Sequence, residues 1–261
     1  MNTQEMKERK KELGYTDAQI AALTGIPVHT IQKFFSGVTP SPDYETLAAL
    51  EQLLSSKKPW DPLIGESFAS YSSTRHQGEY TLEDYYNLPD DCRAELIDGV
   101  FYDMAPPSCP HQLIAGFFFN QLFNHITTKK GKCLPMISPV GVQLDCDDKT
   151  MVEPDVIIIC DRNKVIRRCV CGAPDFILEV LSPSTRRKDL SIKLYKYMNA
   201  GVREYWLIDP MKKKVMVYHL EQDEFPSIYG FDARIPVAVL GNECQIDFQE
   251  MNDYISFLDE A

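Results

Sequence analysis

The chain has 261 residues, of which 44% are hydrophobic, and a formal net charge of −11. This length fits one large domain or two small ones, and the charge argues against a broadly basic protein that coats nucleic acid. No apolar run is long enough to cross a membrane, and the charged segment Met1 to Glu12 lacks the apolar stretch of a signal peptide. We therefore expect a cytoplasmic protein with no membrane association, whose eight scattered cysteines are reduced thiols.

Residues 1–55 have the pattern of a small all-helical domain with four short helices. Pro27 suits the first turn of the third helix, and Gly37 ends that helix. Ala21, Gly25 and Ile31 have the spacing of a helix-turn-helix, in which a small residue lets two helices cross closely and a glycine supplies the turn. On these residues the segment resembles the phage-repressor-like helix-turn-helix family.

The resemblance implies that the third helix presents polar side chains to the DNA major groove, namely His29, Thr30, Gln32 and Lys33. Through Lys58 this module has seven basic and seven acidic residues, so we expect one copy to bind DNA weakly and a homodimer to be needed. The alternative is a small helical module for dimerisation or protein docking.

A linker is expected at residues 56–78, because Pro59, Pro62, Gly65 and a Ser/Thr cluster follow one another with few periodic apolar residues. Residues 79–261 then mix strand and helix patterns, which predicts an α/β domain with a mixed central sheet flanked by helices. The expected helices are 81–86, 111–130 and 186–199, and the expected strands are 94–104 around the turn Asp98-Gly99, 134–137, 142–144, 156–160, 176–181, 204–208 and 214–220.

Three carboxylates in this domain are expected to share one site: Glu95, Asp155 and Glu179. Asp155 leads into a strand-length apolar run, and Glu179 lies inside another. Burying an ionised carboxylate in such a run is costly unless it is paired or binds a cation, and a divalent metal ion removes the repulsion between two acids. Metal-dependent cleavage of phosphodiesters uses this arrangement.

From Tyr80 to about residue 220 the chain resembles the Uma-type restriction-endonuclease family, a branch of the PD-(D/E)XK nuclease superfamily. The resemblance rests on the motifs Glu95-Leu96-Ile97-Asp98-Gly99, Pro110-His111-Gln112, Glu153-Pro154-Asp155, Glu179-Val180-Leu181-Ser182-Pro183-Ser184-Thr185, the set Asp189, Lys193 and Tyr197, and Gly201-Val202-Arg203-Glu204-Tyr205-Trp206. It implies a restriction-endonuclease-like fold and a Mg²⁺ site, with Mn²⁺ as an alternative ion. Asp155 and Glu179 would bind the metal, and Glu95 would ligate it or hold a metal-bound water.

The superfamily lysine normally lies two residues after the second acid, where this chain has Leu181. The resemblance to the Uma-type branch implies that Lys193 is the replacement. Asp189, Lys193 and Tyr197 recur every fourth residue, so they are expected to share one helix face. Arg186 and Arg187 directly follow the Glu179 strand and are candidate DNA contacts. For His111 a catalytic base and a capping or packing role both stay open.

Each candidate also has a structural interpretation. Glu95 would be a surface strand acid, Asp155 a strand cap, and Glu179 a buried salt-bridged acid. Asp189 and Lys193 would form an exposed ion pair.

The functional hypothesis is a metal-dependent DNA endonuclease with an N-terminal DNA-binding helix-turn-helix. The first alternative is a non-catalytic DNA-binding regulator that retains the nuclease fold. The second is a metal-dependent phosphohydrolase acting on RNA or a nucleotide.

Overall fold

The computed structural model describes residues 3–13, 17–24, 26–37, 44–54, 76–89, 92–222 and 225–260. The chain divides into two compact units, residues 1–103 and 104–261. No helix within the described ranges is long and apolar enough to cross a membrane. Residues 56–75 of the expected linker lie outside the described residues.

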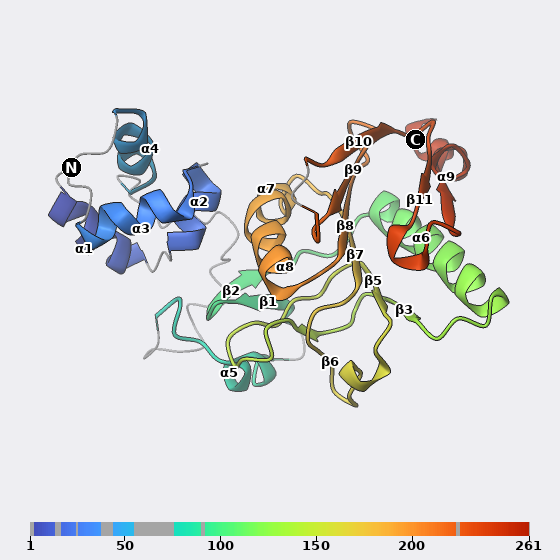
Figure 1. The fold of residues 1–261 in the computed structure, drawn as a ribbon, viewed down its shortest axis with the longest axis horizontal. Coiled ribbons are helices and arrows are strands. Elements are labelled where there is room, and N and C mark those ends of the chain that lie inside the picture. Colours follow the sequence, from blue (N-terminus) through green and yellow to red (C-terminus); the bar gives the residue numbers. More distant parts are fainter. Residues whose placement is uncertain are drawn as a thin grey trace. The chain divides into compact units, whose positions relative to one another are not determined.

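Short helices around a common apolar core form the N-terminal part of the first unit: α1 (Thr3–Leu13), α2 (Asp17–Thr24), α3 (Val28–Ser36) and α4 (Tyr44–Leu54) (Figure 1). Ile20, Ile31 and Leu50 are fully buried in this core. Gly37 ends α3 with a left-handed φ of 84°, and its N–H donates to the carbonyls of Lys33 and Phe34. The predicted helical N-terminus is confirmed, while Gly25, the predicted turn residue, lies outside the described residues.

The first unit also contains α5 (Leu82–Tyr86) and an antiparallel hairpin of β1 (Ala94–Ile97) and β2 (Val100–Asp103). The hairpin turn is the predicted Asp98-Gly99 pair, with φ values of 51° and 75°. A Cβ atom on Gly99 would lie 2.6 Å from the carbonyl oxygen of Gly78, so both the φ angle and the close approach favour glycine there.

The second unit is built on a six-stranded mixed sheet with the order β10-β9-β8-β7-β5-β3 (Figure 1). The β7 and β8 strands are parallel, and every other neighbouring pair is antiparallel. The central strands are buried throughout, as their continuous apolar runs predict. The strands are β3 (Leu134–Ile137), β5 (Val156–Ile159), β7 (Phe176–Val180), β8 (Glu204–Asp209), β9 (Lys214–His219) and β10 (Ser227–Gly230).

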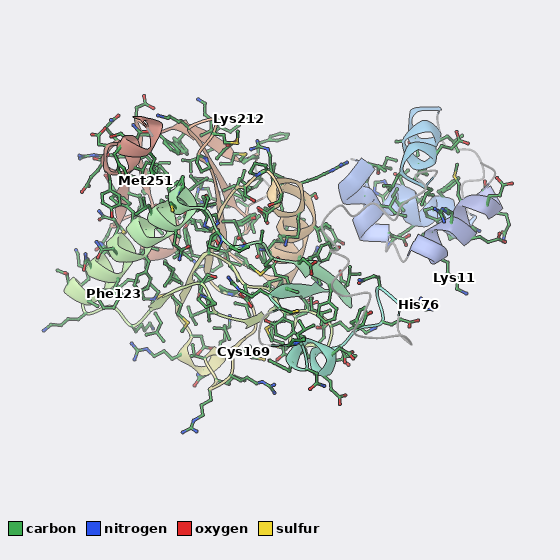
Figure 2. The ribbon with its side chains drawn as sticks, turned by 180° about the vertical axis from the view of Figure 1, so that it is seen from behind. Lys11, His76, Phe123, Cys169, Lys212 and Met251 are labelled. Atoms are coloured by element: carbon green, nitrogen blue, oxygen red, sulfur yellow. A yellow bond between two sulfur atoms is a disulfide. The ribbon has the colours of Figure 1, made fainter. Side chains whose placement is uncertain are left out.

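Helices cover both faces of this sheet (Figure 1). On one face α6 (Cys109–Thr128) and α9 (Phe248–Ile255) pack over the main core, where the ring centroids of Phe118 and Trp206 are 5.7 Å apart. Met251 of α9 is fully buried in that core, whereas Phe123 on the outer side of α6 is 46% exposed (Figure 2).

The connection between the parallel strands β7 and β8 covers the other face. It consists of α7 (Arg186–Lys188), a π-helical turn (Asp189–Lys193) and α8 (Leu194–Ala200), and it ends at Gly201 with φ 89°. Two parallel strands need a long crossover connection, which is usually helical. The sequence predicted one continuous helix over 186–199, and the structure interrupts it with a π turn, a feature that often occurs at functional sites.

Some of the short strands have no counterpart in the predicted set, whereas the strand expected at 142–144 is present. The strand β4 (Val142–Gln143) pairs in parallel with β6 (Val170–Cys171), and β11 (Arg234–Pro236) pairs with β12 (Gln245–Asp247). Strands of two or three residues are too short for an alternating pattern, so β6, β11 and β12 were not recognised.

The expectation that all eight cysteines are reduced thiols is wrong for one pair, because Cys133 and Cys160 form a disulfide. Leu134 pairs with Ile159 across β3 and β5. Extending this antiparallel register by one residue places Cys133 opposite Cys160. The register of β3 and β5 brings the two cysteines together. The sequence, in which they are 27 residues apart, did not predict this pairing.

Candidate active site

Asp155 and Glu179 face each other across two neighbouring strands. Val156 pairs with Leu178 between β5 and β7, so the next residue pair in this antiparallel register is Asp155 and Glu179. The backbone N–H of Val180 donates to Asp155 Oδ2 at 2.7 Å, which ties the first acid to the strand of the second. Asp155 is 9% exposed and Glu179 is 4% exposed. Two carboxylates are therefore held side by side, largely out of water, at a substantial electrostatic cost.

Lys193 and Tyr197 offset the charge of Glu179. The Nζ of Lys193 lies 2.5 Å from Glu179 Oε1, and the hydroxyl of Tyr197 donates to the same oxygen at 2.8 Å. Both side chains are buried. Residues 193 and 197 are one helical turn apart, and the connection between β7 and β8 brings that turn back over the strand that carries Glu179.

Asp189 adds a second carboxylate beside Lys193, with its Oδ1 3.8 Å from Nζ. The side chains of Asp189 and Lys193 are each only 3% exposed, so the alternative of an exposed ion pair is wrong. The hydroxyl of Tyr205 donates to the backbone carbonyl of Asp189 at 3.2 Å. Burial raises the pKa of Tyr205 well above its ordinary value, and the nearby negative charge of Glu179 adds to this shift, so Tyr205 stays a neutral donor.

His111 reaches the same site from the first turn of α6. Its Nε2 lies 3.0 Å from Asp155 Oδ2, and within the described residues its buried Nδ1 has no hydrogen-bond partner. Burial by itself lowers the pKa of His111, but the hydrogen bond and charge of Asp155 outweigh burial, and the net shift is upward. The sequence left the role of His111 open, and tertiary structure places it against an acid 44 positions later in the chain (155 − 111).

Glu95 lies in the first unit. It is fully buried on β1, opposite Tyr102 of β2, so the alternative of a surface strand acid is wrong. Its participation in a site with Asp155 and Glu179 stays a prediction.

The candidate DNA contacts occupy two different segments. On α3, His29, Gln32 and Lys33 are exposed and Thr30 is half-buried, while Ile31 and Phe34 face the helical core. At the start of α7, Arg186 forms an ion pair with Asp209 at the end of β8, and Arg187 is exposed. The contact to Asp209 attaches α7 to the sheet, and the DNA contacts of both arginines stay predictions.

The donor set at Asp155 and Glu179 fits a hard divalent cation. Among the described residues no group of three or more His, Cys, Asp or Glu side chains is arranged to hold a metal. Mg²⁺ usually binds one or two carboxylates and completes its coordination with water and substrate phosphate, so two adjacent acids suffice for it. A structural transition-metal site would need more protein ligands than this pair supplies.

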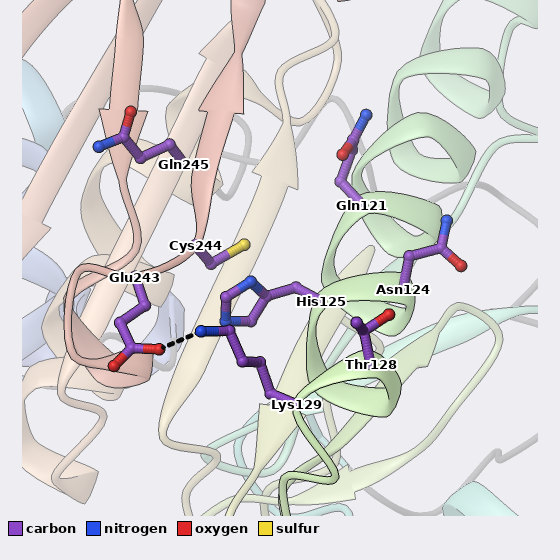
Figure 3. A pocket seen from close by; sticks show the side chains of 8 residues that line it. All are labelled: Gln121, Asn124, His125, Thr128, Lys129, Glu243, Cys244 and Gln245. Atoms are coloured by element: carbon purple, nitrogen blue, oxygen red, sulfur yellow. Dashed lines mark hydrogen bonds and ion pairs between the residues drawn. The ribbon is translucent and has the colours of Figure 1, made fainter.

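A pocket at the far end of α6 is separate from these acids. It lies between α6 and the segment that leads into β12 (Figure 3), lined by Gln121, Asn124, His125, Thr128, Lys129, Glu243, Cys244 and Gln245. His125 is 14 residues after His111 on the same helix (125 − 111), roughly 21 Å along its axis. Lys129 and Glu243 form a largely exposed ion pair at 3.0 Å, and burial raises the pKa of the Cys244 thiol to about 11. This lining offers no acidic pair for cleavage chemistry.

Comparison with known proteins places the chain in a family. Residues 82–247, more than half of the chain, match the Uma2 family, described as "Putative restriction endonuclease", and residues 6–60 match the HTH_3 helix-turn-helix family. An uncharacterized protein of Synechocystis is 26% identical over 156 residues, which cover 59% of this chain and 80% of that protein. The crystal structure of a "putative nuclease belonging to DUF820" from Anabaena variabilis has a TM-score of 0.57 and 20% identity, and covers 67% of this chain and 98% of that one. That likeness shows the fold. The chain belongs to the Uma2 restriction-endonuclease-like family and has a helix-turn-helix in front of the family domain.

Proposed function

We propose that this protein is a divalent-metal-dependent DNA endonuclease that hydrolyses phosphodiester bonds. The observation that carries the proposal is the pairing of Asp155 with Glu179 on adjacent strands, together with a buried lysine 2.5 Å from Glu179. Membership in a restriction-endonuclease-like family supports the reaction class. Mg²⁺ is the proposed ion, with Mn²⁺ as an alternative.

In this proposal Asp155 and Glu179 hold the cation, and Glu95 supplies a third carboxylate or positions a water. A bound divalent cation lowers the pKa of a water and neutralises charge on the scissile phosphate. His111 acts as a positioning residue, because its Nε2 and the Val180 N–H both contact Asp155 Oδ2 and fix the orientation of that carboxylate.

Lys193 is proposed to stabilise the negative charge that develops on the phosphate. It takes the place of the lysine that the superfamily carries two residues after the second acid, where Leu181 cannot donate a hydrogen bond. Tyr197 positions Glu179 through the 2.8 Å hydrogen bond to Oε1. Asp189 balances the charge of Lys193 in a region that water hardly reaches.

The helix-turn-helix is proposed to bind DNA through the exposed polar face of α3. The module as a whole has no excess of positive charge, so we propose that a homodimer supplies two such helices. The arginines at the start of α7 would add phosphate contacts near the cleavage site.

A nicking assay on supercoiled plasmid tests the proposal. The parent protein should convert plasmid to the open-circular form with Mg²⁺ or Mn²⁺ and not with EDTA. Asp155→Asn and Glu179→Gln should lose cleavage while keeping the gel-shift affinity of the parent for DNA. DNA binding without cleavage under every metal condition would favour the alternative of a non-catalytic regulator. Cleavage of RNA or nucleotides alone would favour the phosphohydrolase.

A further inference from the structure

Two cysteines outside the acidic site lie sulfur to sulfur. The Sγ atoms of Cys146 and Cys171 are 3.0 Å apart, although 25 residues separate them in the sequence. Cys146 is exposed and Cys171 is half-buried, so small reagents can reach the pair. This contact is separate from the Cys133–Cys160 disulfide and has no part in the proposed cleavage reaction.

The backbone holds these two thiols together. Gln143 of β4 pairs in parallel with Cys171 of β6, and the Gln143 carbonyl accepts both the Gly172 N–H at 2.9 Å and the Cys146 N–H at 3.4 Å. Cys146 has a left-handed φ of 54°, which turns the chain back toward β6. Gly172, next to Cys171, has a left-handed φ of 100° that favours glycine, and a Cβ atom there would make only ordinary van der Waals contact with Cys146 Sγ at 3.7 Å.

We propose that Cys146 and Cys171 are a redox-active dithiol that a peroxide or an azo oxidant such as diamide converts to an intramolecular disulfide. With hydrogen peroxide, one thiolate attacks an oxygen, the O–O bond breaks, and water and a sulfenic acid form. The second thiol then attacks the sulfenic sulfur, the S–O bond breaks, and a second water leaves as the S–S bond forms. The hydrogen bond with Cys171 raises the pKa of Cys146 to about 11, which keeps Cys146 a thiol near neutral pH and makes it the second sulfur to react.

The Cys146–Cys171 disulfide would restrain a turn that contacts α8, the helix beside the acidic site. Asp145 precedes Cys146 and forms an ion pair with Lys196 on α8, the helix that carries Tyr197. Oxidation would fasten the turn that holds Asp145 to β6, and it would close a loop between residues 146 and 171. Closing a loop restricts the unfolded chain, so we expect the oxidised protein to have a higher Tm than the reduced protein.

Differential alkylation of the full-length protein tests the dithiol. The protein is treated with one equivalent of diamide under native conditions. It is then denatured in the presence of light N-ethylmaleimide, which labels every free thiol. It is then reduced, labelled with heavy N-ethylmaleimide, and sequenced by tandem mass spectrometry. The expected result is heavy label at both Cys146 and Cys171 and light label at Cys109, an exposed thiol that serves as the internal control. In Cys171→Ser, Cys146 should carry light label. Oxidation should also raise the Tm of this variant less than it raises the Tm of the parent, because the variant cannot form the Cys146–Cys171 disulfide.

Light label at both Cys146 and Cys171 in the oxidised parent protein would overturn the proposal. So would a disulfide that joins either of them to another cysteine. Any disulfide between Cys133 and Cys160 forms equally in the parent and in Cys171→Ser, so the difference between the two proteins isolates the second pair. None of these measurements depends on nuclease activity.

Discussion

Replacing Lys193 by methionine removes the buried cation of the acidic site while keeping an unbranched side chain of similar length. In the parent protein Nζ lies 2.5 Å from Glu179 and 3.8 Å from Asp189. The variant therefore leaves two buried carboxylates without their common counter-ion. Tyr197 still donates one hydrogen bond to Glu179, which replaces little of the lost charge interaction.

The expected loss of stability follows from the burial of the pair. Removing one partner of a buried ion pair typically costs about 3–5 kcal/mol, because the remaining charge stays out of water. Lys196→Met is a matched control on α8, which directly follows the π turn that carries Lys193, and the side chain of its partner Asp145 is 26% exposed. A partly exposed pair of this kind contributes about 1 kcal/mol or less. Lys193→Met should thus be several kcal/mol less stable than Lys196→Met.

Urea unfolding in EDTA measures this difference. The chain has two tryptophans, Trp60 in the expected linker and the fully buried Trp206 on β8. A Trp60→Phe background makes tryptophan fluorescence report on the second unit. Adding Mg²⁺ should restore more stability to Lys193→Met than to the parent, because a cation that binds the folded state replaces the missing positive charge. If Lys193→Met and Lys196→Met unfold at the same urea concentration, and Mg²⁺ changes neither, the electrostatic account of the site is wrong.

Further predictions concern activity, pH dependence and DNA recognition. Lys193→Met should also lower the cleavage rate by about 10²–10³, with a metal affinity, measured by calorimetry, at least as high as that of the parent; unchanged turnover would exclude Lys193 from catalysis. In EDTA, the raised pKa of His111 gives a stabilisation that is fully present below about pH 6.5 and is lost as pH rises through the folded-state pKa. His111→Gln should therefore lose more stability, relative to the parent, at about pH 6 than at about pH 8. Equal losses at the two pH values would contradict the pairing of His111 with Asp155. Deleting residues 1–55 should weaken DNA binding in gel shifts and broaden the cleavage pattern. If the truncated protein binds and cleaves like the full chain, and the isolated segment fails to bind DNA at low salt, a protein-docking module is favoured.

The sequence by itself determined the local structure of this protein. Gly37 and Gly201 end helices because their left-handed backbone favours glycine, and Asp98-Gly99 turns a hairpin for the same reason. The apolar runs at 156–159 and 176–180 form fully buried strands. A half-exposed strand would alternate apolar and polar residues, and these runs do not. The motifs around Asp155 and Glu179 also indicated the family, which the comparisons show.

Only the tertiary structure decided which residues meet. The register of β5 and β7 places Asp155 opposite Glu179, and register depends on pairing between distant segments that no local pattern encodes. The π turn and the return of α8 over the sheet bury Lys193 against Glu179, whereas helical spacing alone was also consistent with an exposed ion pair. His111 next to Asp155, and the two sulfur pairs, arise in the same way, because each contact joins segments that are far apart in the chain and close only after the sheet has formed.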